Sequence, residues 1–163
     1  MGSCCPVSRS LSHPPIQTMP TTGQVGFDRT IQETNTWLND ISEAMGDPRR
    51  TVAYHALRGT LFALRDRLPP AEVFDLAAQF PMLIRGLFFE GYRPKGKPEK
   101  MHHDAFLERV QDELQSAGGA NVENAVRAVF QVLEQHVGAG EIEDVRQALP
   151  ADLRDLWSTS SNA

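Results

Sequence analysis

Cysteine is nearly absent from this sequence of 163 residues, and the two that occur, Cys4 and Cys5, are neighbours close to the N-terminus. An adjacent pair cannot supply a framework of disulfides, so the fold must be stabilised by packing. A metal or redox site at this pair is not favoured, because no matching Cys or His spacing follows it. A reducing cytoplasm is the simplest compartment for such a chain.

Long apolar runs and an excess of positive charge are also missing. No apolar segment approaches the roughly 18 residues of a membrane span, and the N-terminal residues lack the apolar core of a secretory signal. Lys and Arg number 16 against 21 Asp and Glu, which gives a net charge of −5 and a pI near 5.5. Because a general nucleic-acid-binding surface is basic, we expect neither nucleic acid nor a membrane as a partner.

The motifs of common enzyme and metal sites do not occur either. The sequence has no P-loop, no G-x-G-x-x-G turn and no G-x-S-x-G elbow. The local histidine cluster, His102–His103–Asp104, lacks the i, i+4 spacing with which two histidines on a helix share a zinc ion. We therefore predict no catalytic residue, no metal ligand and no cofactor, and an enzymatic activity is not favoured.

The sequence does contain a repeat. Shifted by 69 positions, residues 56–88 align without a gap on residues 125–157. Chance would give roughly two identities over this length, and eight are found: Ala56/Ala125, Arg58/Arg127, Leu64/Leu133, Glu72/Glu141, Asp75/Asp144, Pro81/Pro150, Arg85/Arg154 and Leu87/Leu156. We interpret the pattern as a tandem duplication of a unit of about 65 residues.

Both copies show the apolar spacing of helices. Leu57, Leu61, Leu64 and Leu68 recur at intervals of four, three and four residues, which places them on one helical face, and the second copy repeats this spacing. The predicted breaks are Pro69-Pro70 and Pro81 in the first copy, and residues 138–140 and Pro150 in the second. The predicted helices are 27–45, one ending near 68, 71–79 and 81–90, followed by a second set within 104–157. The expected fold is an all-α, tandem-duplicated helical bundle without a sheet.

The repeat also predicts how the chain is divided. Residues 1–26, which hold four of the eleven prolines, read as a disordered tail in which Met19 could be the true start. Residues 27–158 form one domain made of two repeats, about 27–90 and 102–158, and residues 159–163 fray. A unit of this size is marginal by itself, so we expect the two pseudo-equivalent halves to share one core.

The two copies differ most over residues 81–89, where the first copy is apolar nearly all round. Such a helix is usually buried, so the favoured interpretation is a central element gripped by both halves. The other interpretation is a surface patch for a protein partner or a second subunit. Its candidate residues are Met82, Leu83, Phe89 and Tyr92.

Four arginines that recur between the copies also have two interpretations. A charge required by packing recurs wherever the packing recurs, so the favoured role is structural, in bonds to carboxylates or helix ends. The alternative is a polar cleft between the halves that binds a small molecule or a metal and is possibly enzymatic. Its residues are Arg58, Arg85, Arg127 and Arg154.

Two segments carry a resemblance to a known family. Residues 80–94 hold the pattern L-P-x-L-(I/V)-R-G, with Phe80 in place of the usual Leu, followed by an aromatic-Glu-Gly-aromatic-x-P run. Residues 143–157 hold E-D-V-R-x-x-L-P-x-x-L-R-x-L-W. Over about residues 28–157 the chain resembles the bacterial family called domain of unknown function 2267. The resemblance implies a small, soluble, all-helical bacterial protein with no established activity or cofactor.

Together these features favour a non-enzymatic helical protein that binds an unknown protein partner or itself as a homo-oligomer. The runner-up is the small-molecule or metal-binding protein described above.

Replacing Arg58 or Arg127 by Met tests the structural interpretation of the repeated arginines. A methionine fills a similar volume but cannot neutralise a carboxylate or bind a carbonyl, so we expect a lower thermal unfolding midpoint. Midpoints unchanged in both variants, measured by circular dichroism, would refute the structural role.

Overall fold

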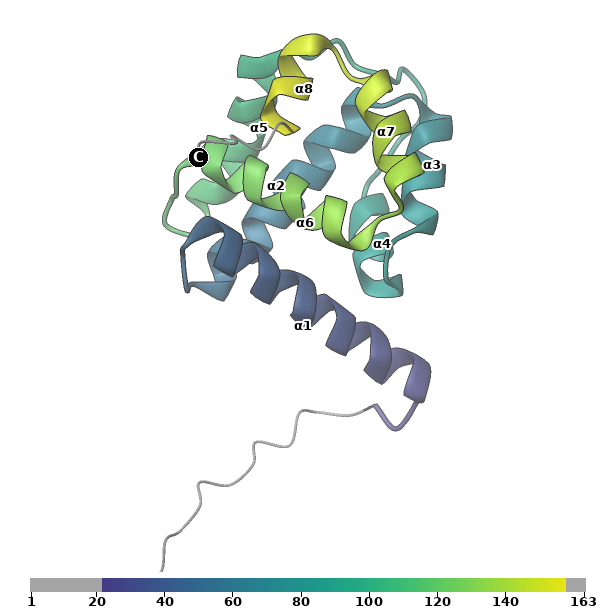
Figure 1. Cartoon of the computed structure of the whole chain (residues 1–163), viewed down its shortest axis with the longest axis vertical. Helices are drawn as coiled ribbons and strands as arrows, with labels where there is room; N and C mark the ends of the chain where they lie inside the picture. Colours follow the sequence, from purple (N-terminus) through teal and green to yellow (C-terminus); the bar gives the residue numbers. More distant parts are fainter. Residues whose placement is uncertain (1–21, 158–163) are drawn as a thin grey trace, which may run out of the picture.

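A computed structural model describes residues 22–157, and within them the chain forms eight helices and no strand (Figure 1). The all-α prediction is therefore confirmed. The predicted tail, up to residue 21, and the predicted frayed end, from residue 158, lie outside the described residues. The helices are α1 (Val25–Met45), α2 (Arg50–Arg67), α3 (Pro70–Ala78), α4 (Met82–Phe89), α5 (His103–Gln115), α6 (Val122–His136), α7 (Ala139–Ala148) and α8 (Ala151–Trp157).

The ends of the helices follow from short-range chemistry. Pro70 opens α3, where a missing N–H is harmless. Asn121 caps α6, since its side chain accepts a hydrogen bond of 2.8 Å from the backbone N–H of Asn124. The start of α1 lies two residues before the predicted one. Asp28 in its first turn accepts hydrogen bonds from the backbone and hydroxyl of Thr22, at 2.6 and 2.8 Å, and this ties the preceding residues to the helix.

The packing interleaves the N-terminal and C-terminal helices. α1 packs on α2 and also on α6, while α2 packs on α5 and α6, and α3 packs on α7. In Figure 1, α2 passes behind α6 through the middle of the molecule. Buried apolar side chains from all eight helices form one continuous cluster. The centre of this core is therefore built by α2 and α6.

The interpretation of residues 81–89 as the central element is wrong. Within the described residues, α4 packs mainly on α1, α2 and α3, at one side of the molecule. Only Ile84 and Phe88 of α4 are buried, whereas Met82 is 54% and Leu83 50% exposed. Apolar composition alone did not reveal the centre. α2 occupies it because its core-facing residues include several small ones, among them Ala53, Ala56, Gly59 and Ala63, which allow close helix contact.

Gly59 marks the closest approach between α2 and α5. A Cβ atom at this position would lie 3.0 Å from Cβ of Glu113 and 3.3 Å from the backbone Cα of Val110. Real Cβ atoms rarely come so close to another carbon, so the spacing of the two helices depends on a residue without a side chain. Gly86 in α4 is the opposite case, because a Cβ there would meet nothing within 4 Å.

Alanine at these two glycines should have opposite effects. Alanine gains about 1 kcal/mol over glycine in a helix interior, but overpacking typically costs about 1–3 kcal/mol. Gly59→Ala should therefore lower the free energy of unfolding, and the control Gly86→Ala should leave it unchanged or raise it. Urea unfolding measures both. Equal stabilisation by the two substitutions would show that α2 and α5 are not held at this distance.

Candidate functional site

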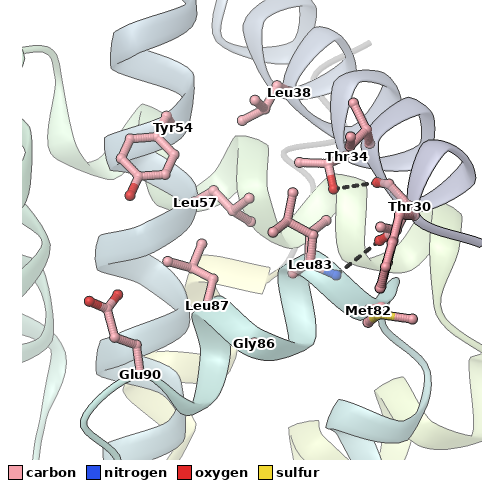
Figure 2. A pocket seen from close by; sticks show the side chains of 13 residues that line it. Thr30, Thr34, Leu38, Tyr54, Leu57, Met82, Leu83, Gly86, Leu87 and Glu90 are labelled. Atoms are coloured by element: carbon pink, nitrogen blue, oxygen red, sulfur yellow. Dashed lines mark hydrogen bonds between the residues drawn. The ribbon is translucent and has the colours of Figure 1, made fainter. Parts of the chain in front are cut away.

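An apolar pit of about 630 Å³ lies between α1, α2 and α4 (Figure 2). We call it the α1–α4 pit. Its lining residues are Phe27, Thr30, Ile31, Thr34 and Leu38 of α1, Tyr54 and Leu57 of α2, Met82, Leu83, Ile84, Gly86 and Leu87 of α4, and Glu90. A concave apolar surface of this size, with very few polar groups, is typical of a binding site.

Two threonines of α1 fix one corner of the pit. The backbone N–H of Leu83, one of the first-turn donors that a helix leaves unpaired, donates to Oγ1 of Thr30 at 2.9 Å. The hydroxyl of Thr34 donates to the carbonyl oxygen of Thr30 at 2.7 Å. Figure 2 shows both bonds where α4 meets α1. Because both hydroxyls are used within the protein, they leave the pit apolar in character.

The α2 side of the pit carries a carboxylate and a phenol ring. Glu90 is the only charged residue among those that line the pit, and its side chain is 62% exposed. The nearest cation is the guanidinium of Arg58 at 3.8 Å, but Arg58 makes its short hydrogen bond to Glu113 of α5. The ring of Tyr54, 39% exposed, lies on the same side of the pit. An exposed carboxylate in a long ion pair with Arg58 therefore borders an apolar hollow.

The structure separates the four residues predicted as a partner surface. Met82 and Leu83 line the α1–α4 pit. Phe89 and Tyr92 do not, and both are partly buried against the core. The Phe89 ring packs against the rings of Tyr92 and Phe74, with 6.0 and 5.5 Å between the ring centroids.

The wall contributed by α1 was not predicted. Phe27, Ile31 and Leu38 form a second apolar stripe on this helix, beside the buried stripe of Trp37 and Ile41. One apolar stripe is enough to pack a helix on the core. A second stripe on α1 is therefore the sequence signal that could have revealed this wall of the pit.

The arginines that recur in both copies make their hydrogen bonds and ion pairs at separate places in the structure. Arg85 donates to the carbonyl oxygens of Ala77 and Phe80, both at 3.0 Å, at the end of α3. Arg127 pairs with Glu123 at 2.7 Å and donates to the carbonyl oxygen of Asp155 at 2.9 Å.

The structure does not gather the four arginines around one hollow. Arg58 spans α2 and α5 through Glu113, and Arg154 lies exposed on α8. None of the four lines the α1–α4 pit or either of two further pockets in the described part of the chain, of about 290 and 310 Å³.

The histidines near the start of α5 contact carboxylates one at a time. Nδ1 of His102 lies 3.1 Å from Asp152, and Nδ1 of His103 lies 2.9 Å from Asp104. Between residues 22 and 157, no group of three or more His, Cys, Asp or Glu side chains is arranged to hold a metal ion.

The repeated acidic residues meet where α3 packs on α7. Burial raises the pKa of the Glu141 carboxyl, and the carboxylates of Asp75, Glu72 and Asp144 raise it further. One carboxyl oxygen of Glu141 is buried and has no hydrogen-bond partner within the described part of the chain. The ionised form of Glu141 therefore destabilises the folded protein.

Over residues 22–157 the chain is all-helical and carries an apolar recess of about 630 Å³. The family model described as "Uncharacterized conserved protein (DUF2267)" matches residues 34–156. The chain therefore belongs to the DUF2267 family, as the two sequence segments indicated. A search of the curated proteins finds no match. None of the helices between residues 22 and 157 combines the length and apolarity needed to cross a membrane.

Replacing Glu141 by Gln should stabilise the protein in a pH-dependent way. A carboxyl whose folded-state pKa is raised contributes stability below its unfolded pKa and loses it as the pH rises through the folded value. The variant should therefore unfold at a higher temperature at pH 7, by about 2–4 °C, and the gain should shrink towards pH 4. Glu108→Gln, at an exposed position of α5, is the control. A gain for Glu141→Gln that does not change with pH would contradict the assignment.

Proposed function

We propose that this protein is a non-enzymatic, bacterial, cytoplasmic binding protein whose α1–α4 pit receives a segment of another polypeptide chain. The main support is that exposed apolar side chains gather around the pit. Phe27 is 52% exposed, Met82 and Leu83 are about half exposed, and all three line it. Exposure of apolar side chains to water is unfavourable in free energy, and a bound partner would remove that exposure. Large exposed apolar patches commonly mark interaction sites.

We further propose that the chain is a tandem duplication whose halves share one core. The helix bounds support this: α2 ends at residue 67 and α6 at 136, α3 begins at 70 and α7 at 139, and α4 begins at 82 and α8 at 151. Each of these pairs differs by 69 residues, the shift that aligns the sequence. The packing is also reciprocal, because α1 contacts α6 while α2 contacts α5.

The differences between the halves support a function for the first half only. α1 has 21 residues and α5 has 13, so α5 lacks a counterpart for the first turns of α1, which bear Phe27 and Thr30. The counterparts of Leu83 and Gly86 are Asp152 and Asp155. Asp152 accepts a hydrogen bond of 3.0 Å from the backbone N–H of His103. The second half thus uses for polar contacts the position that lines the pit in the first.

A small-molecule protein is the second candidate, and one pocket favours it. Its lining comes from α1, from the turn between α3 and α4, and from α6, and therefore from both proposed halves; it includes Glu33, Trp37, Gln79 and His136. The imidazole of His136 stacks on Trp37, with 4.9 Å between ring centroids, and its Nε2 lies 2.7 Å from Asp40. At about 290 Å³ this pocket has less than half the volume of the pit.

Site-specific photo-crosslinking tests the proposal. A photoreactive amino acid at Leu83, in the pit, should crosslink to a polypeptide in cells of the source bacterium. The control is the same amino acid at Phe74, which is 56% exposed and outside the pit. Products formed at position 83 alone support the proposal. No polypeptide product at 83, or the same products at both positions, would contradict it.

A further inference from the structure

We infer that the occupant of the α1–α4 pit is an amphipathic helix of another protein, with an apolar face and a Lys or Arg residue that reaches Glu90. This inference rests on the proposed function and adds the chemistry of the partner. It is drawn from the polar groups of the pit, from the contacts that already occupy them, and from the charges around the pit.

The requirement for an apolar face follows from what the pit can offer. Its interior presents Leu38, Leu57 and Leu87, while the hydroxyls of Thr30 and Thr34 are already used within the protein. A polar group entering among these leucines would lose its water and find few partners. The part of the occupant that enters the pit is therefore apolar.

The requirement for a cation follows from Glu90. Its carboxylate lines the pit at the α2 side, and the only cation paired with it in the described part of the chain is Arg58, at 3.8 Å. Arg58 is held by Glu113 and lies over the ring of Phe62, 4.5 Å from its centroid.

Arg65 also attracts the Glu90 carboxylate, but its Nη1 atom donates to the carbonyl oxygens of Phe88 and Glu90. An occupant that covered Glu90 without a positive charge would take this carboxylate out of water with only these two shared guanidinium groups nearby, which is costly. The nearby face of Tyr54 also favours a cation.

The same charges argue against a second copy of this chain as the occupant. The copy would have to present a basic residue beside an apolar surface. Arg29, between the lining residues Phe27 and Thr30, is paired with Glu33 at 2.9 Å. Arg50 is held by the side-chain oxygens of Asn35 and Asn39, and Arg58 is held by Glu113. With a net charge of −5, two copies also repel each other. A basic partner is attracted by the same charge.

A helix suits the geometry because three helices enclose the pit and leave it open on one side. An amphipathic helix inserts side chains spaced three and four residues apart into such a recess while its backbone hydrogen bonds stay satisfied. An extended segment would leave its own backbone groups facing Leu83, Gly86 and Leu87.

Peptide binding to the full chain tests the inference. Three labelled peptides of about 14 residues are compared by fluorescence anisotropy: a Leu/Lys amphipathic helix, a Leu/Glu helix of the same spacing, and the Leu/Lys composition scrambled to remove the apolar face. The Leu/Lys helix should bind at least about tenfold more tightly than either of the others. Glu90→Lys should reverse the preference between the Lys and Glu helices. Glu108→Lys makes the same charge change on the exposed face of α5 and should leave the preference in place.

Two variants check that the peptide occupies the pit. Leu83→Asp should weaken binding of the Leu/Lys helix at least about tenfold without shifting the thermal midpoint. Gly86→Phe places a ring at the wall of the pit, where a Cβ meets nothing within 4 Å, and should have the same effect through an independent substitution. Binding that survives both substitutions overturns the inference.

Four other results also overturn it: no binding of any peptide, equal binding of the Lys and Glu helices, equal effects of Glu90→Lys and Glu108→Lys, and a dimer of the protein that Leu83→Asp dissociates. Crosslinks through position 83 without a preference for the basic helix would refute the partner chemistry alone. Absence of those crosslinks would refute the proposed function itself.

Discussion

The close contact between α2 and α5 at Gly59 is the constraint on which the remaining packing depends. It joins a helix from the N-terminal part of the chain to one from the C-terminal part, where a glycine of α2 lies against Glu113 and Val110 of α5. With α2 fixed, α1 and α6 pack against it, and α4 packs on α1 and α2. Leu57, which lines the pit, lies on α2 two residues before Gly59. The geometry of the pit therefore depends on a contact at the opposite side of the helix that forms its floor.

For function, the differences between the two proposed halves matter as much as their similarities. Apolar spacing and breaks recur, and they specify helices that can share a core. A binding site needs structural features that the packing of the core does not require. Here these are the longer α1, the apolar exposed face of α4, and a carboxylate at Glu90 whose ion pair with Arg58 is long, at 3.8 Å. Features that only one half possesses cost stability or solubility, so a binding role is the physical reason we assign to them.

The sequence predicted the helices well because apolar spacing and proline breaks act locally. Its favoured interpretation buried residues 81–89, and only its alternative placed Met82 and Leu83 on an exposed apolar surface, together with Phe89 and Tyr92. Leu83 and Phe89 are six residues apart and so lie about 120° apart around the helix, and of the two only Leu83 lines the pit. The wall from α1 was missed because Phe27 and Ile31 look like core residues in the sequence. The structure shows that Trp37 and Ile41 already anchor α1 in the core, which leaves Phe27 and Ile31 at the pit. The centre of the core could not be read from apolarity, since closeness of packing depends on small residues such as Gly59.

The central claim is that the N-terminal and C-terminal sets of helices fold only against each other. Expressing residues 22–91 and 100–157 as separate chains and following each by circular dichroism tests it most directly. The account predicts that neither chain unfolds cooperatively alone, and that an equimolar mixture regains helix content and a thermal transition. A cooperative transition in either isolated chain, unchanged by adding the other, would contradict it.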